Sequence, residues 1–474
     1  MQILAIDQGT TSTRALRMDA SGRLRPVLSL THRQFYPAAG HVEHDPEELL
    51  ANVVRCLAAA EGARLAGIDN QGESCLAWDA EDGKAISPVI VWQDDRTADV
   101  TAALEADGVG PEVMARAGLP LDPYFSASKL GWIVRNIPRA RELAALGRLR
   151  LSTTDAFFRD RLTGRFETDV ATASRTSLMN LETCEWDEEL CRIFGVPIEA
   201  LPPIGPTCGN LGPLPHGLRL GASIVDQQAA LYGHGCRNPG EAKITFGTGA
   251  FAQCVTGTLK RPEKPGPLPT VGWQRPGEAV TYALDGGVYA AAAAVNWACD
   301  LGLFGDYGEI GAFEASSAID RGIAFVPALS GIGCPHWSRQ ARGGWLGLGL
   351  ATGKGDMMQA LLEGIALRSA EVLISMEAEQ SFAGAVSVDG GLSRNGYFTQ
   401  FLADVTGRDL FVSAEPELTA AGLARMAAEG AGIDLPEVRE GTVVAASGAL
   451  HADMRRRRFE AALKAVEGYA RASG

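Results

Sequence analysis

The stretch LAIDQGTTSTRAL, residues 4–16, decides the fold of this chain. Residues 4–6 form an apolar run typical of a buried strand, and Asp7 follows directly at the end of that run. Gly9 marks a turn, after which an alternating pattern resumes at residues 11, 13 and 15. This pattern predicts a β-hairpin whose tip carries a carboxylate, a glycine and several hydroxyl groups.

A hairpin tip of this composition can bind phosphate. Gly9 removes side-chain bulk, so backbone N–H groups and short hydroxyls can approach phosphate oxygens closely. Asp7 can hold Mg²⁺, usually through water, because this ion prefers few carboxylates together with phosphate oxygens. The same residues would also form an ordinary turn with a threonine-rich edge, and the hairpin alone leaves both interpretations open.

Size and composition indicate a two-domain globular protein. At 474 residues, the chain exceeds the length at which one hydrophobic core usually stops growing. Hydrophobic residues make up 46% and charged residues 21%, and no apolar run is long enough to span a membrane. The chain opens with a strand rather than a basic region followed by an apolar core, so we expect a cytoplasmic protein.

Charge and cysteine usage argue against several classes of site. A net charge of −14 disfavours nucleic-acid binding, and the arginine run at 455–458 predicts the solvated part of a terminal helix. The nine cysteines form no Cys-x-x-Cys pair, which predicts reduced thiols rather than disulfides or a zinc site. His41 and His44 have metal-ligand spacing, but the segment from Asp45 onward reads as a helix cap, so we favour a structural role.

Polar residues follow the apolar strands predicted for the first half of the chain. NQGES at 70–74 follows one buried strand, and WQDDRT at 92–97 follows another. Ligands of α/β sheets usually bind at such strand ends. A proline-pinned loop at 118–126 presents Tyr124 and Phe125.

A second focus lies at Asp226. This residue ends a short apolar strand, and small residues then begin a helix. A carboxylate at a helix N-terminus stays ionised, because the dipole and the free N–H groups favour its charge. The alternative is that Asp226 only caps the helix.

Residues 242–252, AKITFGTGAFA, repeat the design of the opening hairpin. Two such hairpins suggest a duplicated fold that closes on phosphates from two sides, with its boundary near residue 235. Further along, the glycines of 389–395 would let an adenine or ribose lie against the backbone. A Gly-x-Gly-x-x-Gly motif is absent, and the residues around 353–355 fail the P-loop pattern.

In order and spacing, these segments resemble the FGGY carbohydrate kinases, and within that family the glycerol kinases. Each motif is weak alone, but the ordered set is specific and spans nearly the whole chain. The motifs are IDQGTTS at 6–12, WQDDRT at 92–97, LDPYFS at 121–126, ASRT at 173–176, DQQAAL at 226–231, FGTG at 246–249 and DGG at 389–391.

The resemblance implies an α/β fold of two RNase H-like domains of the actin/hexokinase type, with an ATP-binding cleft between them. We expect an N-terminal domain at 1–235 with the polyol or sugar pocket, the first phosphate loop and the catalytic aspartate. We expect a C-terminal domain at 236–474 with the second phosphate loop and the adenosine site. ATP and Mg²⁺ are the implied cofactors.

The resemblance also implies individual site residues. Asp226 matches the catalytic base, and Asp7 and Asp226 match the metal site. The residues implied for the polyol or sugar pocket are Glu73, Trp92, Tyr124, Asp226, Gln227 and Phe251. Those implied for ATP are Gly9, Thr10, Thr11, Ser12, Arg14, Thr248, Gly249, Asn296, Gly391 and Asn395.

Phosphoryl transfer requires an acceptor hydroxyl, a carboxylate that takes its proton, and donors or cations for the developing charge, all of which this set supplies. One position departs from the pattern. Glycerol kinases carry an arginine directly before the glutamate that matches Glu73, where this chain has Gly72. The loss of a guanidinium opens space and removes up to about five N–H donors. The alternative substrates are therefore a longer polyol or a ketopentose, such as erythritol, xylulose or ribulose. Asn296 is a milder departure from the usual glutamine.

A different functional class shares this fold, namely an ATP-driven conformational switch or sensor. The cluster of Glu73, Trp92, Tyr124 and Gln227 favours a kinase, because a switch does not need a polyol pocket. We expect a small polyol or sugar as the partner, no nucleic acid and no membrane. A homo-oligomer, dimer or tetramer, is expected because it is frequent in the family.

Overall fold

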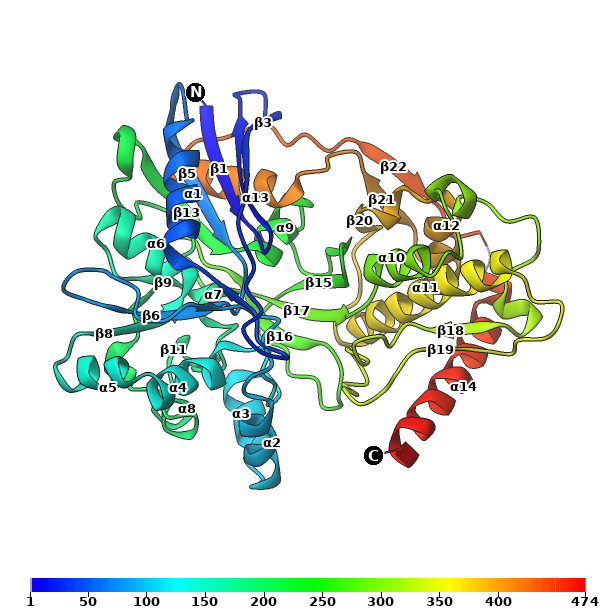
Figure 1. The fold of residues 1–474 in the computed structure, drawn as a ribbon. Helices are drawn as coiled ribbons and strands as arrows, with labels where there is room; N and C mark the ends of the chain where they lie inside the picture. Colours follow the sequence, from blue (N-terminus) through cyan, green and yellow to red (C-terminus); the bar gives the residue numbers. More distant parts are fainter. Residues whose placement is uncertain (1, 448, 474) are drawn as a thin grey trace. The chain divides into compact units, whose positions relative to one another are not determined.

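The computed structural model describes residues 2–447 and 449–473, which form two compact units (Figure 1). The first unit comprises the chain up to Gly235 together with Thr270–Tyr282 and Glu417–Val438. The second comprises Cys236–Pro269, Ala283–Pro416 and the chain from Arg439 onward. The first unit thus takes in two segments of the range 236–474, and the functional domains expected at 1–235 and 236–474 stay a prediction.

The first unit is built on a five-stranded sheet with the order β13-β5-β1-β2-β3. The predicted opening hairpin is present, because β1 and β2 pair antiparallel. β1 also pairs parallel with β5, and β5 pairs parallel with β13. The strands are β1 (Gln2–Gln8), β2 (Ser12–Met18), β3 (Leu24–Thr31), β5 (Ala63–Asn70) and β13 (Arg219–Val225).

Helices cover this sheet because its strands are apolar on their inner positions. Leu4 and Ile6 of β1 are fully buried in one core with residues of α1 (Pro46–Ala58) and α6 (Thr154–Thr163). Close contact between α9 (Asp226–Gly233) and α13 (Leu418–Gly430) holds the segment Glu417–Val438 in the first unit. A Cβ at Gly422 would collide with the Ala229 carbonyl, so only glycine permits this approach.

A four-stranded sheet with the order β4-β7-β6-β8 and several helices complete the first unit. Its strands are β4 (Glu43–His44), β6 (Cys75–Asp79), β7 (Val89–Ile90) and β8 (Leu149–Thr153). The helices are α2 (Ala98–Ala106), α3 (Gly110–Ala117), α4 (Ser126–Asn136), α5 (Pro138–Ala145), α7 (Val170–Ala173) and α8 (Glu188–Phe194).

The second unit repeats the pairing of the first. The seven-stranded sheet has the order β16-β17-β15-β14-β20-β21-β22, of which β16 lies mainly in the range assigned to the first unit. Within the second unit, β14 lies between its antiparallel hairpin partner β15 and the parallel β20. In the first unit, β1 lies in the same way between β2 and β5. The strands are β14 (Ala242–Phe246), β15 (Ala250–Gly257), β16 (Leu268–Trp273), β17 (Thr281–Val288), β20 (Val386–Gly390), β21 (Leu410–Ser413) and β22 (Gly441–Val444).

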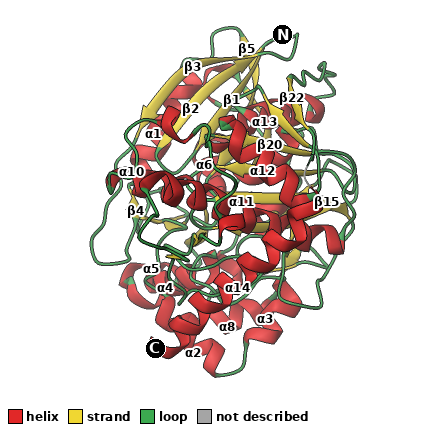
Figure 2. Ribbon diagram, turned by 90° about the vertical axis from the view of Figure 1, so that its right-hand side faces the viewer, coloured by secondary structure: helices red, strands yellow, loops and turns green. Residues whose placement is uncertain are grey.

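Helices α10 (Ala292–Asp300), α11 (Lys354–Glu379), α12 (Gly396–Thr406) and α14 (Ala449–Ser473) accompany this sheet; Figure 2 draws helices in red and strands in yellow. Residues of α10, α11, α12 and α14 share one large apolar core with β14, β15 and β20. Within the described ranges, no helix is both long and apolar enough to cross a membrane.

The arginine run on α14 is solvated only in part, since Arg457 and Arg458 are exposed whereas Arg455 and Arg456 are half-buried. Arg455 forms an ion pair with Asp320 at 2.7 Å, and Arg458 donates to the carbonyls of Ile319 and Asp320 at 3.0 and 2.7 Å. Arg456 donates to the carbonyl of Val405 at 2.6 Å. Three of the four arginines therefore hold α14 against its own unit, a role that helical spacing alone did not reveal.

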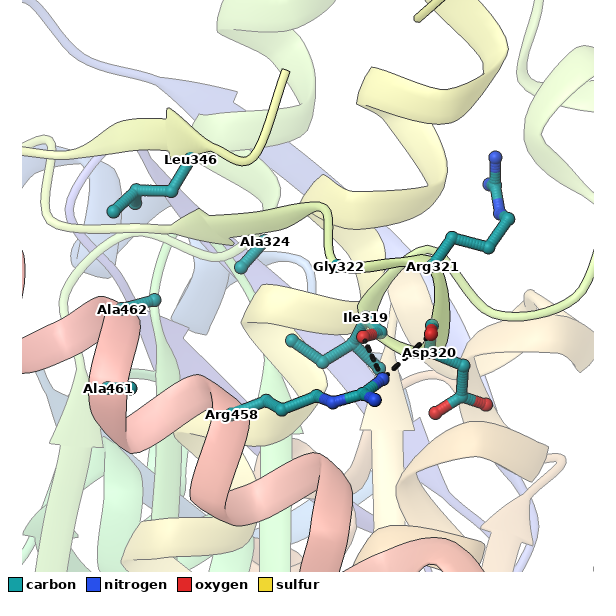
Figure 3. Close-up of a pocket in the computed structure, with 9 residues that line it drawn as sticks. All are labelled: Ile319, Asp320, Arg321, Gly322, Ala324, Leu346, Arg458, Ala461 and Ala462. Carbon is teal, nitrogen blue, oxygen red and sulfur yellow. Dashed lines mark hydrogen bonds between the residues drawn. The ribbon is translucent and has the colours of Figure 1, made fainter. Parts of the chain in front are cut away.

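A cavity of about 510 Å³ lies beside this contact. Figure 3 shows the residues that line it. Its described lining residues come from the turn around Asp320, from the β18–β19 ribbon (Ala324–Val326 and Gly344–Leu346) and from α14. None of them is a residue predicted for ATP, metal or acceptor binding.

Candidate active site

Three aspartates follow one another across the parallel strands of the first unit. Asp7 of β1 and Asp69 of β5 are directly opposite each other in the register, and Asp226 follows the end of the next strand, β13. Asp69 is fully buried, and its Oδ1 accepts the backbone N–H of Gln8 at 3.1 Å. Asp7 and Asp226 are half-buried.

The pKa values of the buried carboxyls show how close these charges lie. Burial raises the pKa of Asp69 well above its ordinary value, and the charges of Asp7 and Asp226 raise it further. Burial also raises the pKa of Asp7, while the guanidinium of Arg14 lowers it in part. A cation at this position would relieve the repulsion among the three carboxylates.

The carboxylate oxygens at this sheet edge are of the type that Mg²⁺ prefers. Among the residues that the structure describes, no three His, Cys, Asp or Glu side chains form a closed metal cage. That agrees with a Mg²⁺ site, because this ion usually takes one or two carboxylates together with phosphate and water oxygens. The residues present therefore fit the predicted ion.

The tip of the first hairpin is held by the residues around it. The backbone N–H of Gly9 donates to the Ser12 carbonyl at 3.0 Å and closes the turn. The hydroxyl of Thr10 accepts a hydrogen bond from Trp92 Nε1 at 3.0 Å. His32 Nε2 lies 2.9 Å from the Thr10 carbonyl oxygen. Thr11, in contrast, is exposed, so the tip combines a fixed residue with an accessible hydroxyl.

Arg14, predicted to contact ATP, lies opposite Asp7 in the hairpin. It forms an ion pair with Glu417, which precedes α13. About a third of its side chain is exposed, so the guanidinium still reaches the surface of the unit. Its contact with ATP stays a prediction.

Aromatic rings line the predicted acceptor pocket. The rings of Trp92 and Tyr124 meet edge to face with centroids 5.7 Å apart, and Tyr124 meets Phe125 in the same way at 5.1 Å. Lys129 Nζ, which is buried, donates to the Tyr124 carbonyl at 2.9 Å and fixes the loop. The backbone N–H of Trp92 donates to Ser74 Oγ at 3.1 Å, which joins the loop after β7 to the turn after β5.

Glu73 adopts a backbone conformation that is unusual for a residue with a side chain. Its φ of 58° lies in the left-handed region, and such residues cluster at functional sites. Arg175 Nε donates to Glu73 Oε1 at 2.7 Å, and both residues are buried. Glu73 therefore holds a fixed carboxylate in the turn that the sequence predicts as a ligand site.

Asp226 is the first residue of α9, and Val225 takes the N-cap position without a side-chain cap bond. Asp226 Oδ1 accepts the N–H of Gln227 at 2.7 Å. The N–H groups of the first turn of a helix favour a negative charge at this position, and the ionised state of Asp226 stays a prediction. The geometry thus departs from the alternative in which Asp226 acts as an ordinary N-cap.

Gly72 does not open empty space in the direction of its missing side chain. A Cβ at this position would lie 2.8 Å from Cγ2 of Val225, closer than such contacts occur. Val225 therefore fills the volume next to Gly72 and excludes a side chain there. The space expected where the guanidinium is missing lies beyond this Cβ position and stays a prediction.

In the second unit, the predicted ATP residues gather around the tip of the second hairpin. The first N–H groups of α10 donate to this tip, that of Ala291 to the Thr248 carbonyl at 2.9 Å and that of Ala292 to the Gly247 carbonyl at 3.1 Å. The same helix carries Asn296, which is exposed and accepts the Tyr307 hydroxyl at 2.7 Å.

The glycine pair after β20 lies beside the same hairpin. Phe246 pairs with Gly390 in the parallel register, and the N–H of Gly391 donates to the Phe246 carbonyl at 3.1 Å. Asn395 caps α12, because its side chain accepts the N–H of Phe398 at 2.9 Å, and it also donates to Ile310. Thr248, Gly249, Asn296 and Gly391 thus lie on adjoining elements of one unit.

Phe251, predicted for the acceptor pocket, belongs to the second unit, whereas the other predicted pocket residues belong to the first.

His44 is buried against His32, with ring centroids 4.7 Å apart, and burial lowers the pKa of His44 to about 3. His41, in contrast, is exposed, and the structural role favoured for this pair stays a prediction.

Sequence reasoning missed Asp69, Arg175 and Lys129 as site residues. Asp69 reads as the last residue of a buried strand, and the parallel register with Asp7 is the signal that would have found it. Arg175 stood in a recognised motif, but its partner Glu73 lies 102 residues away. Lys129 is hidden in an ordinary helical pattern, with no local signal of its burial.

Residues 2–219 match the N-terminal domain of the FGGY family of carbohydrate kinases, and residues 242–431 match its C-terminal domain. The chain belongs to the FGGY family of carbohydrate kinases. The predicted two-domain α/β fold is confirmed. The predicted enzyme class, an ATP-dependent kinase for a polyol or sugar hydroxyl, is also confirmed and is favoured over the switch or sensor.

Individual relatives support the same family. The chain is 39% identical over 458 residues to a glycerol kinase of Bdellovibrio bacteriovorus, and the match covers 92% of both chains. It is 41% identical over 457 residues to glycerol kinase 1 of Pseudomonas aeruginosa, again with 92% of each covered. Among solved structures, it matches Plasmodium falciparum glycerol kinase with ADP at a TM-score of 0.89 and 28% identity, over 98% of each chain.

Proposed function

We propose that this FGGY kinase transfers the γ-phosphoryl group of ATP to a hydroxyl of a small polyol, with glycerol as the first acceptor to test. The observation that carries the proposal is the position of Asp226, at the first turn of α9 and beside the carboxylates of Asp69 and Asp7. The names of the relatives at about 40% identity support glycerol.

Asp226 acts as the general base. Its carboxylate takes the proton of the acceptor hydroxyl, the hydroxyl oxygen bonds to the γ-phosphorus, and the bond from that phosphorus to the leaving ADP oxygen breaks. The N-terminus of α9 keeps Asp226 ionised and ready to accept that proton. General-base assistance of this kind contributes about 10²–10⁴-fold.

Asp7 and Asp226 are the residues that would hold Mg²⁺, with Asp69 as a buried neighbour on the strand between them. When bound, the ion neutralises charge on the phosphate oxygens of ATP. Asp69 itself is fully buried, which suits it to support the site rather than to touch a ligand.

The two hairpins are the phosphate-binding elements of this proposal. The first contributes Gly9, Thr10, Thr11, Ser12 and Arg14, and the second contributes Thr248 and Gly249. Asn296, Gly391 and Asn395 surround the nucleotide. The hydrogen bonds from α10 to the tip around Thr248 support this assignment, because they keep that tip rigid.

The acceptor is bound by Glu73, Trp92, Tyr124, Asp226, Gln227 and Phe251. Glu73 supplies a fixed carboxylate for a hydroxyl, and Trp92 and Tyr124 supply apolar faces for its carbon atoms. A longer polyol or a ketopentose is the second candidate, because Gly72 offers no donor where glycerol kinases carry arginine. The Val225 side chain beside Gly72 weighs against a larger cavity at that point.

A cytoplasmic location and a homo-oligomer, dimer or tetramer, complete the proposal. The location rests on the nine cysteines, which are all free thiols in the structure and suit a reducing compartment. The homo-oligomer is proposed because dimers and tetramers are frequent in the family. Size-exclusion chromatography with light scattering would test the oligomeric state.

The test is a coupled ADP-release assay with ATP and Mg²⁺ across glycerol, erythritol, ribitol, xylulose and ribulose. We expect glycerol to give the highest kcat/KM, and Asp226→Asn to lower kcat by about 10²–10⁴-fold. The matched control is Asp45→Asn, since Asp45 caps α1 through the N–H of Glu47 and asparagine caps equally well. Full transfer activity in Asp226→Asn would exclude the proposed base.

A further inference from the structure

We infer that Arg175 is a positioning residue for acceptor recognition, which fixes the carboxylate of Glu73 in the pocket. The inference rests on the proposed function, because it concerns the same pocket. Arg175 was not among the residues predicted for the site. It reaches Glu73 from the turn that follows α7, 102 residues away in sequence.

The contact between Arg175 and Glu73 is short and shielded from solvent. Arg175 Nε donates to Glu73 Oε1 at 2.7 Å, and the side chains are only 6% and 5% exposed. A charge-assisted hydrogen bond in such surroundings is stronger than a neutral one and restricts the rotation of the carboxylate. Glu73 is thereby held in one orientation before any acceptor arrives.

The backbone of Glu73 is fixed as well. Its φ of 58° is costly for a residue with a Cβ, by about 1–3 kcal/mol, and persists only where the surroundings impose it. Ser126 Oγ donates to the Glu73 carbonyl at 3.0 Å and supports this conformation. Main chain and side chain of Glu73 are therefore both positioned by neighbours.

Arg175 is itself held by a short, well-capped helix. Asp169 accepts the N–H groups of Ala171 and Thr172 at 3.0 Å, and the N–H of Arg175 donates to the Thr172 carbonyl at 3.0 Å. The guanidinium lies 5.4 Å from the ring centroid of Phe125. Arg175 thus joins Glu73 to the aromatic loop that carries Tyr124.

This arrangement defines what the pocket can recognise. The Glu73 carboxylate that pairs with Arg175 presents oxygen atoms that accept hydrogen bonds, so it selects an acceptor that donates a hydroxyl proton. Gly72 has no side chain that could donate a hydrogen bond to the acceptor. Recognition of the acceptor by Glu73 therefore depends on the orientation of its carboxylate, which Arg175 fixes.

A purely structural role is the competing explanation, and the chain offers a matched control. Arg159 is a buried arginine of the same unit that pairs with Glu167. Neither residue touches the predicted pocket residues in any contact described here. Arg159→Ala should therefore lower stability without changing acceptor affinity.

The experiment compares Arg175→Ala, Arg175→Lys and Arg159→Ala with the unmodified enzyme. KM for acceptor, KM for ATP, kcat and the thermal unfolding midpoint are measured for each. We expect Arg175→Ala to raise the acceptor KM by roughly 10- to 150-fold, the factor that corresponds to loss of one hydrogen bond to a charged group. The ATP KM should stay within about 2-fold of the unmodified value. Added guanidinium should restore part of the affinity, and Arg175→Lys should lie between.

An unchanged acceptor KM in Arg175→Ala, or an equal rise in Arg159→Ala, would overturn the inference. Where Arg175→Ala does not fold, Arg175→Gln keeps Glu73 and one N–H donor, and its acceptor KM is compared with that of the unmodified enzyme in the same way. Binding of glycerol and erythritol by calorimetry separates the two proposals. Weaker binding in Arg175→Ala upholds the inference even if the unmodified chain transfers no phosphoryl group, a result that would reject the proposed function alone.

Discussion

The hydrogen bond from Trp92 to Thr10 joins the predicted acceptor pocket to the first phosphate hairpin. Trp92 Nε1 lies 3.0 Å from Thr10 Oγ1, and the ring of Trp92 also meets that of Tyr124. Trp92→Phe removes the N–H group and keeps an aromatic ring against Tyr124. Thr10→Val removes the hydroxyl and keeps the shape of the side chain.

The size of the effect follows from the nature of the bond. A partly buried bond between neutral groups contributes about 0.5–1.5 kcal/mol, so its loss should lower kcat/KM for ATP by roughly 2- to 12-fold. Because both substitutions remove the same bond, the double variant should lose little more than either single one. The unmodified protein, the two single variants and the double variant form the cycle, measured by coupled ADP release.

Additive losses in that cycle would refute the reasoning, because they would mean that Trp92 and Thr10 act separately. Trp132→Phe is the control for loss of an indole. Trp132 lies on α4, where the guanidinium of Arg96 stacks 4.8 Å from its ring, and it contacts neither Thr10 nor Tyr124 in the described structure. We expect its kcat/KM for ATP to stay within about 2-fold of the unmodified value.

Two further predictions concern the backbone and pH. Gly390→Ala should lower the free energy of unfolding by about 1–3 kcal/mol and raise the ATP KM, because φ is 90° and a Cβ would collide with Phe246. Chemical denaturation and steady-state kinetics check this. Gly396→Ala is the control, because a Cβ at Gly396 meets no atom within 4 Å. For Asp169, burial first and the charge of Asp155 second raise the pKa to about 6. The folded protein therefore binds this proton more tightly than the unfolded chain, so stability falls as pH rises. Relative to Asp169→Asn, the unfolding free energy should drop by about 1.4 kcal/mol from pH 5 to pH 7.5 in urea titrations, and a constant difference would contradict the raised pKa.

Local patterns were enough to predict most of the framework. Both hairpins, the helix after Asp45 and the strand-to-helix junction at Asp226 follow from apolar runs, turn glycines and capping residues, which act within a few positions. The order of these segments then indicated the family. Nothing in that reasoning required knowledge of which distant segments meet.

The residues that escaped prediction are those defined by long-range contacts. Arg175 and Glu73 lie 102 residues apart, and no periodic pattern links them. The arginine run on α14 looked solvated, because its partner Asp320 lies 135 residues away. The contact between Val225 and Gly72 could not be predicted from the sequence for the same reason. Val225 ends β13, which lies beside β5 and the turn of Gly72 only once the sheet has folded.

The sheet itself assigns different roles to the three aspartates. Asp69 is fully buried and already accepts the N–H of Gln8, so it can act on a ligand only through its charge. Asp7 lies in register with Asp69 and opposite Arg14, a position that suits a cation more than a proton acceptor. Only Asp226 combines partial exposure with the free N–H groups of a helix N-terminus, which lower the cost of its charge. A general base must both reach a substrate hydroxyl and stay ionised, and this combination is why we propose Asp226 rather than Asp7 or Asp69 as the base.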